Sequence, residues 1–544
     1  MQRLLAAIAL SLCCFFTASA QTSNPGRLNS EQSSNWESQG NKLQSLLFHI
    51  ENMYVEDVDF ESIVETAIVN MLEEMDPHSV YIPAEDLQAA DEPLNGNFEG
   101  VGIQFNIFKD TIMVVSPISG GPSEKLGIMA GDRIVTVDGE MVAGIGVTNK
   151  DVQRLLKGPK GTLVTVGIKR GNESDLITFE IIRDKIPIYS VDASFMVTPE
   201  IGYIKVNRFA KTTMTEMYSA FLKLKRAGMK DLVLDLQGNG GGMLRTAIQM
   251  ADEFLSEDKL LVYTEGRMFP RENTRARIPG RFEKGRLVVL IDQGSASASE
   301  IVSGAVQDWD RGLIVGRRSF GKGLVQRPVR LTDDSAVRLT VQKYYTPAGR
   351  CIQKSYEEGV EEYRKEKYQR FESGELMSMD SLELPDSLKY ATRITGRTVY
   401  GGGGILPDVF VPLDTTDNSA YFSSILRKGL DSRFALSYVD SLRTELESEF
   451  PTEDEFMEKF EVDEAMSADF QEFLTAEGIE WDADGWTRSG NAITLRLKAM
   501  IGRNLVEPST FYRVISGLIE SLQKAVTILE DGTFDQSNLA HDTF

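Results

Sequence analysis

The segment LVVLIDQGSASASEIVSGAVQDW, residues 287–309, decides the fold of this chain. Its first five residues are all apolar, which is typical of a short strand buried on both faces of a parallel sheet. A turn rich in glycine and serine follows at residues 294–300, and apolar residues then recur at helical spacing up to Trp309. A strand, a tight turn and a helix in this order predict an α/β unit.

The same pattern occurs on either side of this segment. Residues 232–236 and 313–315 are further apolar runs, and the stretches between the runs have helical spacing, so they predict more strands of one sheet. Residues 100–170 differ, because short alternating apolar runs such as Ile103, Phe105 and Ile107 are separated by glycines. That alternation predicts a small β-rich module.

Helical regions are expected outside these two parts. Residues 43–75 carry two apolar faces at helical spacing, residues 353–390 are a charged insertion, and the chain after about residue 413 is acidic and helical. One long apolar stripe runs from Phe511 to Leu529, and we interpret it as core, with docking of a second subunit as the alternative. Together the patterns indicate a multidomain α+β protein.

The composition excludes several classes of protein. A length of 544 residues favours three or four domains, and 42% apolar with 26% charged residues is typical of a soluble globular protein. The formal net charge of −23 argues against nucleic-acid binding through a basic face. The three histidines, His49, His78 and His541, are too few for most histidine-based zinc sites. We interpret His49 and His78 as packing or capping residues.

Residues 1–20 have the pattern of a cleavable signal peptide. Arg3 precedes an apolar run at residues 4–16, and small residues at 18–20 form a cleavage site. The run is shorter than the roughly 20 residues that span a bilayer, and no other segment is long and apolar enough for a stable membrane span. A lipid anchor on Cys13 or Cys14, which would leave the protein membrane-associated, is the alternative. After cleavage Cys351 is the remaining cysteine, and we interpret it as an inert thiol.

Ser297 is the candidate nucleophile, because a serine at a strand-to-helix turn is exposed at the positive end of a helix. The alternative is that Ser297 only caps the helix. A serine needs a base, and with histidine so scarce the candidate is a lysine kept neutral by burial. Lys322, in the segment SFGKG 25 residues downstream, fits this role, and Gln326 can orient its amine. A solvated turn remains open for this segment, whereas a phosphate loop is excluded because no serine or threonine follows Lys322.

Two glycine-rich loops complete the candidate machinery. The loop DLQGNGGG, residues 235–242, leaves a predicted buried strand, and its N–H groups can point at a developing oxyanion together with the N–H of Ala298. The loop FEGVGI, residues 98–103, opens the β-rich module and can capture a peptide's terminal carboxylate while the peptide adds as a strand. Taken alone, the loop at residues 235–242 is better explained as an ordinary tight turn, and a generic glycine loop is the alternative for residues 98–103.

These segments in combination resemble the carboxyl-terminal processing proteases, also called tail-specific proteases, over roughly residues 36–412. Residues 54–79 resemble the family's N-terminal helical segment, and GVGI at 100–103 with AGDRI at 130–134 resemble its PDZ domain. Residues 346–347 and 401–407 resemble the end of its protease domain, whose fold is crotonase-like α/β. The resemblance implies a dyad of Ser297 and Lys322, with Gln326 assisting the lysine.

The resemblance also implies the residues around the dyad. Gly241, or its neighbour, and Ala298 would line the oxyanion hole. The implied substrate-binding residues are Gly100, Val101, Gly102, Ile103 and Lys157. Two positions depart from the family pattern, since Gln237 stands where arginine is frequent and Arg317 where glutamate is frequent. Neither change removes a catalytic group.

The resulting prediction is a PDZ module inserted beside a crotonase-like serine protease domain, with helical N- and C-terminal regions. The expected domains are a signal peptide at 1–20, an N-terminal helical region at 21–88, the PDZ domain at 89–184, the protease domain at 185–412 and a C-terminal helical region at 413–544.

The resemblance implies a periplasmic serine endopeptidase that recognises protein C-terminal tails and needs no cofactor or metal. Its expected partners are proteins or peptides with exposed C-termini, and an adaptor protein or a second copy could dock on residues 413–544. Two other functions stay open. One is a non-catalytic PDZ scaffold or adaptor for envelope proteins. The other is an acyl-CoA enzyme on the same crotonase-like fold, which explains neither the signal peptide nor the carboxylate-binding loop.

Overall fold

The computed structural model describes residues 30–171, 175–382, 384–537 and 539. The predicted signal peptide lies outside them. The chain divides into two compact units, Met1–Thr66 and Ala67–Phe544. Helix α1 (Ser30–Met53) belongs to the first unit, and α2 (Phe60–Glu73) crosses the boundary between the two. Across the described ranges, we find no helix that combines the length and the hydropathy needed to cross a bilayer.

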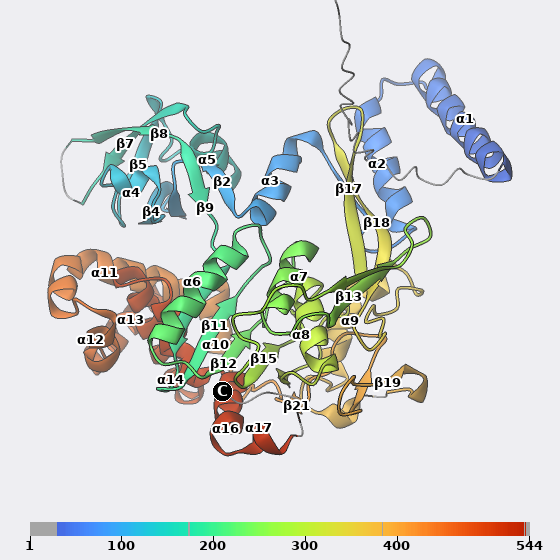
Figure 1. The fold of residues 1–544 in the computed structure, drawn as a ribbon. Helices are drawn as coiled ribbons and strands as arrows, with labels where there is room; N and C mark the ends of the chain where they lie inside the picture. Colours follow the sequence, from blue (N-terminus) through green and yellow to red (C-terminus); the bar gives the residue numbers. More distant parts are fainter. Residues whose placement is uncertain (1–29, 172–174, 383, 538, 540–544) are drawn as a thin grey trace, which may run out of the picture. The chain divides into compact units, whose positions relative to one another are not determined.

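A six-stranded sheet forms the centre of the second unit (Figure 1). Five of its strands run parallel, and the edge strand β10 is antiparallel to β11. The strands, in their order across the sheet, are β10 (Val191–Met196), β11 (Ile201–Val206), β12 (Asp231–Asp235), β15 (Leu287–Ile291), β16 (Leu313–Gly316) and β21 (Val409–Phe410). The strands predicted at residues 232–236, 287–291 and 313–315 are thus confirmed, to within a residue at each end.

Both faces of this sheet are buried, as the continuous apolar runs predict. In β15, Leu287, Val289 and Ile291 face one core, and Val288 and Leu290 face the other. The first core is completed by α6 (Thr213–Arg226), α7 (Leu244–Asp252) and α8 (Ala298–Asp308). The second is completed by α16 (Glu520–Glu530) and α17 (Thr533–Gln536), drawn red in Figure 1.

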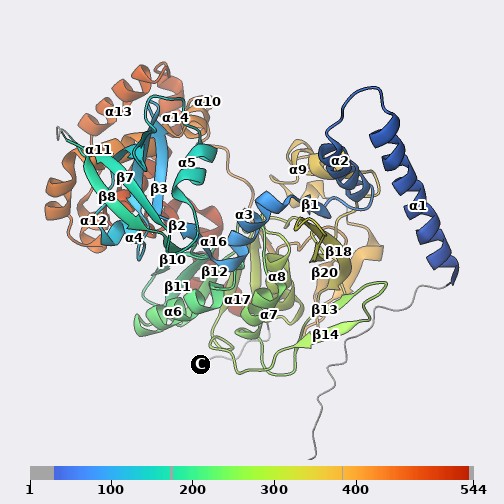
Figure 2. The same cartoon turned by 90° about the horizontal axis from the view of Figure 1, so that it is seen from above.

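A second, antiparallel sheet lies beside the first. Its long hairpin carries the SFGKG segment at its base, and Figure 2 shows β1 alongside β18 with α9 close by. The strands are β1 (Val80–Ile82), β18 (Ala336–Tyr345), β13 (Leu260–Glu265), β14 (Glu272–Arg275) and β17 (Leu324–Arg330), which pairs with β18. The charged insertion contains α9 (Val360–Glu372), η1 (Met379–Ser381), η2 (Asp386–Leu388) and β19 (Lys389–Ala391), which pairs with β20 (Thr398–Tyr400).

The β-rich module is a separate small sheet with its own apolar core. After α3 (Ala84–Asn95), the chain enters the module through β2 (Asn97–Gly100) and leaves it through β9 (Asp184–Pro187), and these two strands pair. The sheet order is β3 (Ile103–Phe108), β4 (Thr111–Pro117), β5 (Arg133–Val137), β7 (Leu163–Lys169) and β8 (Ile177–Ile182), with β6 (Glu140–Met141) on β5. The helices are α4 (Pro122–Lys125) and α5 (Asn149–Leu156).

The C-terminal region is helical, as predicted, but its apolar stripe does not form one face. Val514 packs in the core of a helical bundle, whereas Leu522 and Leu529 pack on the six-stranded sheet. The helix breaks between them, because Ile519 takes an extended conformation (φ −86°, ψ 92°). The bundle contains α10 (Ala420–Lys428), α11 (Leu430–Glu449), α12 (Glu453–Lys459), α13 (Glu464–Ala476), α14 (Ala483–Leu505) and α15 (Thr510–Ile515), and η3 (Ser516–Leu518) joins it to α16.

If α16 is part of the sheet's core, truncating its buried face must destabilise the protein. Leu522 is fully buried, so Leu522→Ala should lower the free energy of unfolding by about 2–5 kcal/mol. Leu518, four residues earlier, is 38% exposed, and Leu518→Ala should change it by about 0.5 kcal/mol. Urea unfolding followed by circular dichroism measures both. Equal effects of the two variants would contradict this packing.

Candidate active site

Ser297 lies at the junction between β15 and α8, where the sequence predicts the nucleophile. It is the N-cap residue of α8, and its backbone has φ 55° and ψ −109°. A positive φ at a residue other than glycine costs on the order of 1–3 kcal/mol, so the surrounding contacts must hold the turn in this shape. Such strain is common where a side chain is presented for chemistry.

The buried carboxylate of Glu300 supplies the main contact. It accepts hydrogen bonds from the N–H groups of Ser297 (2.7 Å) and Lys322 (2.9 Å). It also accepts from the Gly321 N–H (2.7 Å) and the Ser319 hydroxyl (2.5 Å). Burial raises the pKa of Glu300 to about 7, and these four donors oppose that shift. One carboxylate therefore fixes the backbones of the candidate nucleophile and the candidate base together.

The hydroxyl of Tyr344 is a second bridge between the same two residues. It lies 3.0 Å from the carbonyl oxygen of Ser297 and also within hydrogen-bond distance of the carbonyl oxygen of Lys322. Tyr344 belongs to β18 and is almost completely buried. The bridges place the turn after β15 against the segment before β17.

The Lys322 amine faces Gln326. Its Nζ donates to Gln326 Oε1 at 3.0 Å, and the Gln326 amide nitrogen donates to the carbonyl oxygen of His78. Burial lowers the pKa of Lys322, although the charges of Asp76 and Glu300 act in the opposite direction. Within the described ranges no hydrogen bond joins Lys322 Nζ to Ser297 Oγ. The amine is thus held and partly desolvated, in the way a neutral lysine base requires.

Gly241 approaches Ser297 more closely than any other residue type could. It has φ 100°, and a Cβ on Gly241 would lie 2.8 Å from Ser297 Cβ and 3.0 Å from the Ala298 nitrogen. The Gly241 N–H donates to Asn239 Oδ1 at 2.9 Å. The Ala298 N–H has no acceptor among the residues that the structure describes. Of the two predicted oxyanion donors, Ala298 is therefore the one whose N–H is available in this conformation.

The two positions that depart from the family pattern lie against the C-terminal segment. Gln237 Oε1 accepts from the Ser521 hydroxyl at 2.7 Å. Arg317 Nε donates to Gln293 Oε1 at 3.0 Å, and burial lowers the pKa of its guanidinium. Both side chains border one cavity with residues 517–521. Both residues that differ from the family pattern therefore lie beside the start of α16.

The predicted carboxylate loop lies at one end of β3, far along the chain from Ser297. In the described part of the chain β3 pairs with β4 alone, which leaves its other edge open, and the N–H group of Gly102 has no acceptor there. Lys157 follows α5, and its backbone bridges to Gly100. Its amine points to Glu92 Oε2 at 2.5 Å and lies 5.2 Å from the centre of the Phe98 ring. The loop and Lys157 are therefore neighbours, but Glu92 holds the amine.

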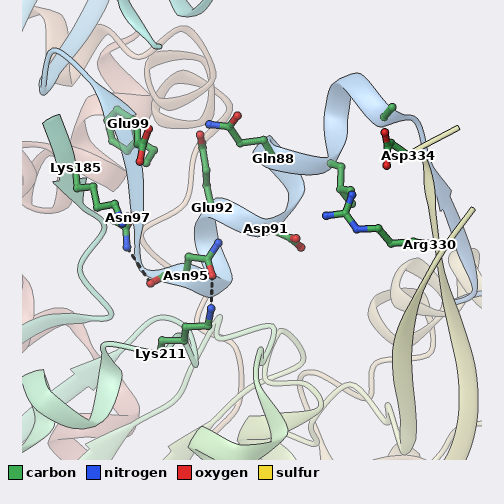
Figure 3. Close-up of a pocket in the computed structure, with 13 residues that line it drawn as sticks. Gln88, Asp91, Glu92, Asn95, Asn97, Glu99, Lys185, Lys211, Arg330 and Asp334 are labelled. Atoms are coloured by element: carbon green, nitrogen blue, oxygen red, sulfur yellow. Dashed lines mark hydrogen bonds between the residues drawn. The ribbon is translucent and has the colours of Figure 1, made fainter. Parts of the chain in front are cut away.

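A cleft of about 800 Å³ adjoins this loop (Figure 3). Polar side chains from α3, including Gln88, Asp91 and Asn95, line one wall, and Lys211 donates to Asn95 Oδ1 at 2.6 Å. Arg330 and Asp334, at the end of the β17–β18 hairpin, also border the cleft. Neither Ser297 nor Lys322 lines it, so this cleft is separate from the candidate catalytic residues. Across the described residues, no three His, Cys, Asp or Glu side chains are placed to hold a metal ion.

Three residues at the site were not predicted from the sequence as site residues. Glu300 had a local signal, because a serine followed three residues later by glutamate is the pattern of a capping box. Tyr344 and His78 had none, since they reach the site from segments remote in sequence.

Four segments of the chain match models of known protein families. Residues 200–362 match the model of peptidase family S41, and residues 113–170 match that of the PDZ domain. Residues 11–86 match the N-terminal domain of the activating protease CtpB, and residues 421–507 match a family of unknown function, DUF8443.

Relatives that match across several of these parts share one description. A carboxy-terminal-processing protease of Bartonella bacilliformis is 37% identical over 312 residues, which cover 56% of this chain and 70% of that protein. The carboxy-terminal processing protease CtpA of Bacillus subtilis is 34% identical over 350 residues, which cover 64% of this chain and 73% of that protein. This chain belongs to the carboxy-terminal processing proteases.

The solved structure of the photosystem II D1 C-terminal processing protease is 28% identical, covers 73% of this chain and 92% of its own, and gives a TM-score of 0.36. The family assignment confirms a serine peptidase with a PDZ domain. The family matches and the observed helices and sheets confirm the predicted multidomain α+β fold as well.

Gly241 offers a direct test of the close approach at the protease site. Gly241→Ala should lower kcat by about 10²-fold, because the new methyl group would displace Ser297 or the Ala298 N–H. Gly240→Ala is the matched control, since Gly240 has no positive φ and a Cβ there meets nothing within 4 Å. Peptide cleavage by the two purified variants measures the difference, and similar rates would contradict the proposed geometry.

Proposed function

We propose that this protease is an exported, periplasmic endopeptidase that binds protein C-termini through its PDZ domain and cleaves with Ser297 as nucleophile and Lys322 as general base. The observation that carries the proposal is the shared carboxylate of Glu300, which fixes the backbones of both residues. The signal-peptide pattern of residues 1–20 supports export. The relatives named as carboxy-terminal processing proteases support the substrate class.

In this mechanism the neutral Lys322 amine takes the proton of the Ser297 hydroxyl as the oxygen attacks the peptide carbonyl. Its hydrogen bond to Gln326 Oε1 orients the amine, so that the lone pair can face the serine. The Ala298 N–H stabilises the oxyanion, and Gly241 leaves space for it. Lys322 then gives the proton to the leaving amine, and water hydrolyses the acyl-enzyme.

Substrate binding would use the open edge of β3. A C-terminal peptide can pair with this edge while its carboxylate binds the N–H groups at residues 100–103. A non-catalytic scaffold would share this binding mode, so the functions differ in whether the bound tail is cut.

Removing either member of the dyad should abolish cleavage. We expect Ser297→Ala and Lys322→Ala each to lower kcat by about 10³-fold or more while leaving the circular dichroism spectrum unchanged. Because the base must be neutral, wild-type kcat should rise with pH, and the lowered pKa of Lys322 places this rise below the pH at which free lysine titrates. Cleavage of an unfolded reporter measures both effects. A fully active variant would refute the mechanism.

Tail recognition makes a separate prediction. An unfolded reporter with an apolar C-terminal tail should be trimmed faster than the same reporter with an amidated tail, because amidation removes the carboxylate that the loop binds. Binding of both reporters to Ser297→Ala, measured by calorimetry, serves as the control. Binding without trimming by the wild-type protein would favour the scaffold, and equal trimming of both reporters would refute recognition through the carboxylate.

A further inference from the structure

The tight turn at residues 76–79, which precedes the PDZ domain, is built around one buried carboxylate. Asp76 Oδ1 accepts from the N–H groups of His78 (2.8 Å) and Ser79 (2.9 Å), and Asp76 Oδ2 accepts from the Ser79 hydroxyl at 2.6 Å. Both Asp76 and Ser79 are buried. An aspartate that bonds to N–H groups two and three residues later fixes the peptide planes between them. The direction of the His78 carbonyl group is therefore set by Asp76.

This turn is fastened to the strand that lies opposite Gln326. The Thr340 hydroxyl donates to Asp76 Oδ1 and the Thr340 N–H donates to Ser79 Oγ, both at 3.1 Å. Thr340 is the register partner of Gln326 across the β17–β18 hairpin. Strand β1, which begins at Val80, continues the attachment by pairing with β18. The turn thus keeps a fixed position relative to the residue that contacts the catalytic lysine.

The His78 carbonyl decides which way the Gln326 side chain faces. An amide group has a nitrogen that donates and an oxygen that accepts. Because the nitrogen of Gln326 donates to His78, its oxygen is left to accept from Lys322 Nζ. With the amide reversed, its NH₂ group would face the amine and would donate to the lone pair that a neutral Lys322 needs for the Ser297 proton.

The His78 side chain has a different task from its carbonyl. Its Nε2 lies 2.7 Å from the Tyr363 hydroxyl of α9, and its ring packs edge-on against the rings of Phe320 and Tyr363. Burial and the nearby Lys322 charge lower the pKa of His78 to about 4. The imidazole is therefore neutral at neutral pH, and it adds no positive charge near the lysine.

We infer that the turn at residues 76–79 is a positioning element of the catalytic lysine, with Asp76 holding the His78 carbonyl and that carbonyl orienting Gln326. This inference rests on the proposed role of Lys322 as the base. It extends the active site to a segment more than 200 residues before the nucleophile. Asp76 is a positioning residue and does not touch the substrate.

The charges around Lys322 allow a test through the pH dependence of kcat. This pH dependence would not change if Asp76 only stabilised the fold. Asp76 and Glu300 favour the charged amine, Arg338 disfavours it, and His78, which also faces Lys354, is neutral. Asp76→Asn keeps an oxygen that can accept from the turn's N–H groups but removes the charge. Asp76→Ala removes both the charge and the acceptor, and exposed Asp86→Asn on α3 is the control.

The experiment measures kcat per folded protein against pH for the full chain, with folding checked by circular dichroism. For Asp76→Asn we expect the wild-type rate at alkaline pH and a rise of kcat that is shifted to lower pH. For Asp76→Ala we expect a loss of about tenfold or more at every pH. Asp86→Asn should leave the whole profile unchanged.

An unshifted profile of Asp76→Asn, or a wild-type alkaline rate of Asp76→Ala, would overturn the inference. The first outcome would show that Asp76 does not act on the lysine, and the second that the turn does not position it. The proposed function fails by a different result, which is cleavage by Lys322→Ala. The two failures are therefore distinguishable.

Discussion

The proposed active site of this protease depends on one buried carboxylate that accepts hydrogen bonds from two separate segments. Glu300 accepts from the backbone of Ser297 on one side and from residues 319–322 on the other. A buried charge without donors would be costly, so each of these hydrogen bonds also stabilises the carboxylate that organises them. With a pKa raised to about 7, Glu300 takes up a proton as the pH falls below neutrality, and the protonated carboxyl group gains an O–H donor and accepts less strongly from its four donors. The clamp is thus strongest above neutrality, where Glu300 carries its full charge.

The proposed catalytic residues could be predicted from the sequence because they come after the parallel strands. Gly241 lies after β12, Ser297 after β15 and Lys322 after β16. The carboxyl ends of adjacent parallel strands open at the same edge of a sheet, so turns that are far apart in the chain are brought together there. Apolar runs identify such strands, and glycine-rich turns mark their carboxyl ends. The strands, Ser297 and Lys322 therefore needed only local signals, whereas the resemblance to the family was needed to single out Gly241 within its loop.

The rest of the site depends on contacts that no local pattern reports. Asp76 and His78 reach Gln326 from across some 250 positions, and their own segment has the sequence of an ordinary turn. The pairing of Lys157 with Glu92 joins α5 of the PDZ domain to the helix before it. The apolar stripe at residues 511–529 predicts correctly that most of its residues are at least partly buried. Its spacing does not show that some of them pack in the bundle and others on the six-stranded sheet. In each case the sequence does not show which other segment of the chain the residue packs against.

The β-rich module and the C-terminal helical bundle are each joined to the protease domain by two connections, one where the chain enters and one where it leaves. The β-rich module, which contains the PDZ match at residues 113–170, lies between Gly100 and Asp184, and these two residues are register partners in the β2–β9 ladder. The helical bundle lies between β21 and α16, and both of these elements pack on the central sheet. A module that is joined by two stretches of chain can tilt relative to the protease domain but cannot rotate freely. Removal of the β-rich module would leave two ends held side by side in one ladder, whereas removal of the bundle would also take away Tyr512 of α15, which packs on the core of the central sheet.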